Sequence, residues 1–275
     1  MKKMMKIELE RAFKSKMFIV SILIGLCIVA FDIMNNIIPQ RYVLDEFIKM
    51  GEEAYTEIQL PGLYMQWMGV RPGTYIFLYY FIMPLLTALP YSVSIIMDVR
   101  RRYINNIFTR INKKEYYKAK LFTQFITGGL VATVPLIVSY IASAMILPAY
   151  KPLVVTGQYV FREKHVVGRL FYNNPFAVAI IIFLSVFIGF GLINCIAYIF
   201  ADLVNNRFMV ALTPFIAYFF MYVMCTVADR VAPMQYIGIV NLEYSGVIYM
   251  FIDTVILLVA IILSYIVRSR RKDEI

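Results

Sequence analysis

The chain has 275 residues, of which 61% are hydrophobic and only 16% are charged, and its formal net charge is +10. A soluble domain of this size needs a larger charged surface, so the composition excludes a soluble globular protein. The mean hydropathy of +0.72 and recurring apolar runs of about twenty residues indicate helices that cross roughly 30 Å of hydrocarbon. Because backbone amides in lipid must be satisfied within each segment, we expect an all-α membrane protein.

Residues 1–16 precede the first apolar run and have the pattern of an amphipathic helix. Its apolar face consists of Met5, Leu9, Ala12 and Phe13, and its basic residues are Lys2, Lys6, Arg11 and Lys14. Such a helix lies in the inner membrane interface, with its lysines toward lipid phosphates. The alternative is an ordinary charged flank of the first span. The regular spacing favours the interfacial helix.

Six apolar segments are long enough to cross the membrane, and together with their loops they form one transmembrane domain over residues 1–275. They cover residues 17–38, 74–97, 119–147, 176–200, 208–227 and 247–267. Nineteen Lys and Arg fall on one predicted side and eight on the other. The positive-inside rule therefore predicts a multi-pass protein of the cell (plasma) membrane with both termini in the cytoplasm. Acidic residues of the first outer loop agree with this orientation: Asp45, Glu46, Glu52, Glu53 and Glu57.

The predicted cytoplasmic loop 98–118 concentrates charge, because eight Lys and Arg lie between Arg100 and Lys120. A short helix over about 100–111 would carry one apolar stripe at helical spacing. The stripe consists of Ile104, Ile107, Phe108 and Ile111, and the opposite face of Arg102, Asn105, Asn106, Thr109 and Arg110. Asn112, with Glu115 three residues later, is typical of a capped helix start. We therefore expect a second helix that begins there and continues into the next span.

An ordered apolar stripe favours a docking surface over a loop that only sets topology. Two kinds of surface fit the pattern equally well. One is a helix that inserts into a groove of a partner protein. The other is a helix that lies on the bilayer with its arginines on phosphates. The residues alone leave both open.

The segment "DVRRRYINNIFTRINKKEYYKAKLF" resembles the cytoplasmic loop of ABC-2 type transporter permeases. In that loop an acid, a short apolar helix and a turn are followed by a Tyr and a Lys that enter the next span. The resemblance extends to the whole plan of an interfacial helix, six spans and cytoplasmic termini. It implies that the short helix is a coupling helix seated in an ATPase groove. The residues that it assigns to ATPase coupling are Asp98, Arg102, Ile104, Ile107, Phe108, Arg110, Ile111 and Lys120.

The resemblance also implies a set of partners. Two copies of a separate ATP-binding subunit would hold ATP and Mg, and a second permease chain would complete a homodimer or heterodimer. We expect contact with membrane lipids, no nucleic acid, and no cofactor on this chain itself. The sequence has no G-x-x-x-x-G-K-[ST] motif to cradle ATP phosphates, so we expect the chain not to be an enzyme.

Polar residues inside predicted spans are costly and mark candidate functional positions. Asp32, Asn194 and Asp253 are candidates for a translocation path. The alternative is that the two acids face water or a partner helix near the outer headgroups, while Asn194 hydrogen-bonds between helices. We expect no metal site, since the single histidine, His165, falls in an outer loop where we expect it to be solvated.

Two functions are consistent with these patterns. The first is the permease subunit of an ATP-driven exporter that moves an amphipathic or lipid-like cargo, peptides included. The second is a non-transporting membrane sensor or immunity protein with the same topology. The sequence leaves open the cargo, the direction of transport, the identity of the second chain and any need for an accessory subunit.

Overall fold

A computed structural model describes residues 2–50, 60–152, 161, 165–201, 204, 206–230, 233, 237–238 and 244–270. Within these residues the fold is helical, and five helices are long and apolar enough to cross a membrane. The expectation of an all-α chain with several membrane-length helices is therefore confirmed. Three acids of the first predicted outer loop lie outside the described residues: Glu52, Glu53 and Glu57.

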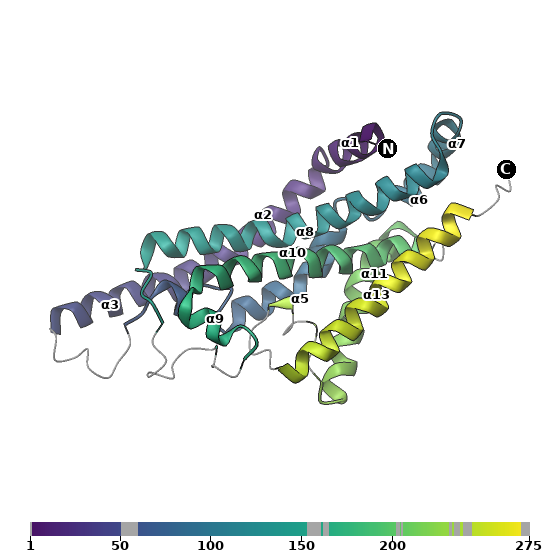
Figure 1. Cartoon of the computed structure of the whole chain (residues 1–275). Helices are drawn as coiled ribbons and strands as arrows, with labels where there is room; N and C mark the ends of the chain where they lie inside the picture. The colour runs from purple at the N-terminus through teal and green to yellow at the C-terminus, as the bar shows by residue number, and fades with distance from the viewer. Residues whose placement is uncertain are drawn as a thin grey trace.

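The long helices run side by side around a central pair (Figure 1). That pair is α8 (Lys113–Ile146) and α10 (Pro175–Phe200), which pack along each other. On α8 lie α2 (Lys16–Asp32) and α5 (Thr74–Ala88), while α11 (Arg207–Val227) and α13 (Tyr244–Arg270) lie against α10. Four of the predicted spans coincide with single apolar helices to within a few residues: residues 119–147, 176–200, 208–227 and 247–267 correspond to α8, α10, α11 and α13.

The helix that contains the first predicted span is longer than the predicted range of 17–38. The helix continues from α2 through a π-helical segment, η1 (Ile33–Ile37), into α3 (Ile38–Met50). Pro39 has no amide hydrogen to donate and is usually a sign that a helix ends. The wider π turn directly before it lets the chain pass the proline without stopping. The first twelve residues of the predicted outer segment that begins at residue 39 are therefore helical.

The second predicted span, residues 74–97, is not one helix. It is divided into α5, which ends at Ala88, and α6 (Ser94–Arg100), with turns between them around Pro90. At 1.5 Å per residue the fifteen residues of α5 extend about 22 Å, which is less than the hydrocarbon core. Six membrane-length helices are therefore not confirmed, because Pro90 interrupts the second predicted span whereas Pro84 stays inside α5.

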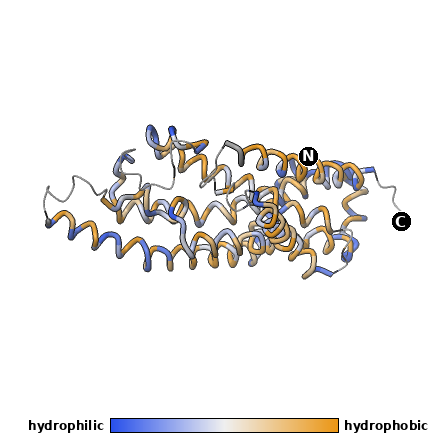
Figure 2. The backbone as a smooth tube through the Cα atoms, turned by 90° about the horizontal axis from the view of Figure 1, so that it is seen from below, coloured by the Kyte–Doolittle hydropathy of each residue, from blue (hydrophilic) through white to orange (hydrophobic). Residues whose placement is uncertain are grey.

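Large apolar side chains cover much of the outside of the bundle. Figure 2 shows that hydrophobic residues continue along most of the length of the helices. On α13, for example, Phe251, Ile256 and Leu263 are exposed. The interior holds large aromatic rings instead, among them Trp67, Tyr79 and Phe190, which are fully buried. Helices that are apolar on their outer faces as well as their inner ones are typical of a lipid-embedded bundle.

Polar side chains form a buried contact at the centre, where α8, α10 and the α5–α6 turn meet. Gln124 Nε2 donates to Ser92 Oγ at 2.8 Å and to Asn194 Oδ1 at 2.9 Å, and Asn194 Nδ2 donates to the Gln124 carbonyl oxygen at 2.8 Å. The prediction that Asn194 hydrogen-bonds between helices is confirmed. Gly128 packs directly over the base of Asn194, so the two helices approach closely here.

The two ends of the bundle contain different segments of the chain. The N-terminal helix α1 (Lys2–Phe13), the short helix α7 (Tyr103–Phe108) and the last turns of α13 lie toward the same end in Figure 1. This common end agrees with the prediction that both termini and the basic loop share one side of the membrane. At the other end His165 is buried, with 5% of its surface exposed, so the expectation of a solvated histidine is wrong.

Candidate functional site

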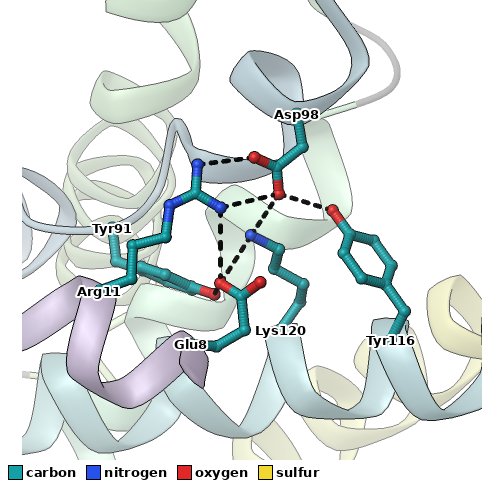
Figure 3. Close-up of polar contacts among 6 residues, drawn as sticks. All are labelled: Glu8, Arg11, Tyr91, Asp98, Tyr116 and Lys120. Atoms are coloured by element: carbon teal, nitrogen blue, oxygen red, sulfur yellow. Dashed lines mark hydrogen bonds and ion pairs between the residues drawn. The ribbon is translucent and has the colours of Figure 1, made fainter. Parts of the chain in front are cut away.

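The most concentrated polar chemistry of the described residues lies at the end of the bundle that carries α1 and α7. Six side chains from four stretches of chain meet there (Figure 3). They are Glu8 and Arg11 of α1, Tyr91 of the α5–α6 turn, Asp98 of α6, and Tyr116 and Lys120 of α8. We call these six residues the ion cluster.

Lys120 lies at the centre of the ion cluster and pairs with both acids. Its Nζ is 2.6 Å from Asp98 Oδ2 and 2.9 Å from Glu8 Oε2. The side chains of Glu8 and Lys120 are 0% exposed and that of Asp98 is 1% exposed. The pairs therefore lack the solvent screening that weakens a surface salt bridge.

Arg11 closes the ion cluster from the solvent side. Its Nη2 donates to Asp98 Oδ1 at 2.6 Å and its Nη1 donates to Asp98 Oδ2 at 3.1 Å, which is the bidentate geometry that a guanidinium favours. Nη1 also lies 3.8 Å from Glu8 Oε2. Two acids and two bases are thus held together with no net charge.

The two tyrosines complete the hydrogen bonding of the acids. Tyr116 donates its hydroxyl to Asp98 Oδ2 at 2.8 Å, and Tyr91 donates to Glu8 Oε2. The ammonium of Lys120 also lies over both rings, 5.0 Å from the Tyr91 centroid and 5.4 Å from the Tyr116 centroid, within cation–π range. Lys120 is therefore surrounded by two carboxylates and two aromatic faces.

Burial and charge act in opposite directions on Asp98. Burial raises the pKa of its carboxyl, but the hydrogen bond from Arg11 and the charge of Lys120 outweigh burial, so the pKa of Asp98 is lowered. Asp98 accordingly stays ionised. One polar atom of the ion cluster remains unsatisfied: Glu8 Oε1 is buried without a hydrogen-bond partner.

Helical spacing explains why these residues meet. Met4, Glu8 and Ala12 repeat every four residues and form the buried face of α1 that packs on α8. On α8, Tyr116 and Lys120 are likewise four residues apart, so both point toward α1. The break after Ala88 brings Tyr91 and Asp98 to the same point from the side of α5 and α6.

The apolar stripe predicted for the short helix is present, and it packs against other residues of the same chain. Ile107, with 8% of its surface exposed, packs with Met4, Tyr116 and Ala119 next to the ion cluster. The other stripe residues, Ile104, Phe108 and Ile111, are partly buried against the same group. The helix is shorter than the predicted range 100–111. The backbone of Arg102 has a left-handed conformation, with φ of 52°, and this residue ends the turn that precedes α7.

The polar side of α7 faces outward. Its exposed residues are Arg102, Asn105, Asn106, Thr109 and Arg110. The predicted cap of the next helix is confirmed, because Asn112 Oδ1 accepts a hydrogen bond from the Lys114 amide at 3.0 Å. Of the residues assigned to ATPase coupling, Arg102 and Arg110 are thus exposed, while Asp98 and Lys120 are inside the ion cluster.

The three candidates for a translocation path lie in three separate environments. Asp32 is 3% exposed at the end of α2 and accepts from Asn36 Nδ2 at 2.6 Å, so of the two alternatives given for it, water or a partner helix, it does not face water. Asn194 is bound to Gln124 in the central polar contact. Asp253 is partly buried and lines a small cavity beside Tyr218, between α10, α11 and α13. The described residues therefore show no single path that joins the three.

Sequence reasoning missed Glu8, Tyr91 and Gln124, and it listed Arg11 only as a surface base. The signal for Glu8 was present, since it lies four residues from both Met4 and Ala12 on an otherwise apolar face. No local pattern marks Tyr91, whose role depends on the break at Pro90. Within the described residues no three His, Cys, Asp or Glu side chains are grouped as metal ligands.

Comparison with known proteins identifies no relative. No family model matches the chain, and neither do curated proteins or solved structures. The features that bear on the function are therefore the helical bundle and the ion cluster next to α7.

Proposed function

We propose that the chain is the permease subunit of an ATP-driven exporter of the ABC-2 type, coupled to a separate ATP-binding subunit through α7. The observation that carries the proposal is the packing of α7. Its apolar side is packed on α1 and α8, while its polar side is exposed at the end of the bundle. The docking surface is then the exposed polar side of α7, and the stripe serves to anchor the helix to its own chain.

The ion cluster supplies a route from α7 into the bundle. α7 lies between α6 and α8, so a displacement of α7 moves both neighbours. Asp98 on α6 and Lys120 on α8 are joined by an ion pair, and Glu8 and Arg11 tie α1 to them. Because α8 and the α1–α2 segment continue into membrane-length helices, a push on α7 would reach the spans as one rigid movement.

The remaining parts of the proposal concern what moves and what assembles. We propose an amphipathic or lipid-like cargo, since the bundle is apolar and rich in aromatic side chains. Two ATP-binding subunits would hold ATP and Mg, and a second permease chain would pack on the apolar outer faces. The excess of basic residues on the α7 side supports a plasma-membrane protein with cytoplasmic termini.

The test is co-purification of the chain with the ATP-binding subunit encoded beside its gene, followed by ATPase measurement in lipid. The variant Asn106→Glu/Arg110→Glu reverses the charge of the exposed side of α7 without touching the ion cluster. We expect the amount of ATP-binding subunit that co-purifies with this variant to fall at least tenfold, while the unfolding temperature of the variant stays unchanged. Lys118→Glu is the matched control, because Lys118 is exposed on α8 at the same end of the bundle.

Two results would overturn the proposal. If no neighbouring ATP-binding subunit binds the wild-type chain, the chain is not a permease of this type and the sensor or immunity function takes its place. If the α7 variant retains the ATPase as well as the Lys118 control does, the exposed side of α7 is not the docking surface.

A further inference from the structure

The helix α1 has two functional faces. One face, with Met4, Glu8 and Ala12, is buried against α8 and contributes to the ion cluster. The other face forms a shallow apolar groove along the helix, with charged residues on its margins. The groove is lined by Lys2, Met5, Lys6, Leu9, Glu10, Phe13 and Lys14. Because the ion pairs fix the inner face, the groove is held outward and no described part of the chain covers it.

The margin of the groove is positive. Lys14 is neutralised by an ion pair with Glu10 on the next turn. Lys2 and Lys6 are exposed, and among the described residues neither forms an ion pair, although the charge of Lys6 also acts on Glu10. Spaced four residues apart, these two lysines lie on one side of the apolar row formed by Met5, Leu9 and Phe13. The groove thus offers hydrocarbon contact next to three ammonium groups and one carboxylate, which is a net charge of +2.

The position of the groove matches the surface of a membrane leaflet. α1 is followed after two residues by α2, whose apolar stretch is long enough to cross the bilayer. An apolar row bordered by lysines at this depth is complementary to an acyl chain with an anionic headgroup. A second copy of the same groove would bring four like charges together, so self-association through this face is disfavoured.

We propose that the outer face of α1 is a binding site for anionic phospholipid, and that the bound lipid stabilises the seating of α1 and with it the ion cluster. The phosphate interacts with Lys2 and Lys6, and the acyl chain lies along Met5, Leu9 and Phe13. The site requires neither an ATPase nor a cargo and is therefore independent of the proposed transport function.

The experiment uses the purified full-length chain in dodecylmaltoside with equal amounts of phosphatidylglycerol and phosphatidylcholine. Native mass spectrometry gives the ratio of the two lipids that stay bound, and a thermal scan gives the unfolding temperature with each lipid alone. We expect the wild-type chain to retain phosphatidylglycerol preferentially and to unfold at a higher temperature with it. In Lys2→Gln/Lys6→Gln the preference should fall by about fivefold per lysine, the factor that ~1 kcal/mol per basic residue represents.

The matched control is Lys114→Gln/Lys118→Gln, which removes the same charge from exposed positions on α8 at the same end of the bundle. It should keep both the lipid ratio and the stabilisation by phosphatidylglycerol. A second variant, Met5→Ser/Leu9→Ser, should lower retention of both lipids because it removes the apolar row. An unchanged lipid ratio in the Lys2/Lys6 variant would show that these two lysines do not hold the lipid and would overturn the site. An equal loss in the α8 control would show that the basic end binds lipid only by its total charge, which would overturn the site as well.

Discussion

Asp98 illustrates how much a single carboxylate holds together at the residue scale. It accepts both guanidinium nitrogens of Arg11, pairs with Lys120 and accepts the hydroxyl of Tyr116, so it connects α1, α6 and α8. Replacing it by Asn leaves Lys120 and Arg11 with one acid, Glu8, between them. The energetic consequence is that of an unpaired buried charge, which exceeds the value of the ion pair itself.

We expect Asp98→Asn to lower the free energy of unfolding by about 3–5 kcal/mol, the usual cost of removing one partner of a buried pair. Reversible unfolding in a denaturing detergent measures the difference. Glu10→Gln is the control, since Glu10 lies on the same helix but forms only an exposed pair with Lys14, for which about 0–1 kcal/mol is typical. Equal effects of the two variants would contradict the role given to Asp98.

The lowered pKa of Asp98 sets the direction of a pH dependence. Because the folded pKa lies below the ordinary value of 3.8, the unfolded chain binds the proton first as the pH falls. The stabilisation by Asp98 is therefore complete above about pH 4 and is lost as the pH falls through the folded pKa. The stabilities of the wild-type chain and Asp98→Asn should converge on acidification. A constant difference between them down to about pH 2 would argue against this titration.

At the scale of elements, α8 and α10 approach most closely where Gly128 faces Asn194. A Cβ at position 128 would lie 2.5 Å from the Cβ of Asn194, which is the fixed base of that side chain and cannot rotate away. We expect Gly128→Ala to lower the free energy of unfolding by about 1–3 kcal/mol, although alanine by itself favours a helix. Gly73→Ser, at a position with open space around it, should stay near the wild-type value in the same unfolding assay.

The sequence predicts those elements whose pattern is local. Helical spacing located α7 and the buried stripe residue Ile107, and the Asn112 cap located the start of α8. The prolines could not be interpreted in this way, because Pro39, Pro84 and Pro90 have the same local chemistry and different outcomes. The π turn before Pro39 keeps the helix continuous, whereas the chain breaks at Pro90 to bring Tyr91 to Glu8. Tertiary contacts decide between these outcomes.

The candidate site was only partly accessible to the same reasoning. Asp98 and Lys120 were selected for a role in ATPase coupling, but their place in the ion cluster was not predicted. The pairing of Glu8 with Lys120 joins residues 112 positions apart, and no helical period or short motif carries that information. Charge and hydropathy predicted which segments share one end of the bundle, but not which side chains meet there.

For the whole molecule, the common end of α1, α7 and α13 makes a prediction about sidedness. In a chain whose three cysteines are replaced by alanine, single cysteines at Lys2 and Asn106 should react with a membrane-impermeant maleimide only in inside-out vesicles. A cysteine at Lys151, between α8 and α9 (Gly168–Asn173), should react only in right-side-out vesicles. Labelling of positions 2 and 106 from opposite sides would be incompatible with the bundle in Figure 1.

The distance along the chain between the partners of the ion cluster also has a consequence for biosynthesis. Glu8 leaves the ribosome 112 residues before Lys120, which at about 5–20 residues per second is a delay of roughly 6–22 s. During that interval Glu8 and Arg11 have neither Asp98 nor Lys120 as a partner and must remain hydrated. The helix α1 is therefore made well before it can reach its final place, and a nascent chain halted before residue 120 should leave α1 open to protease.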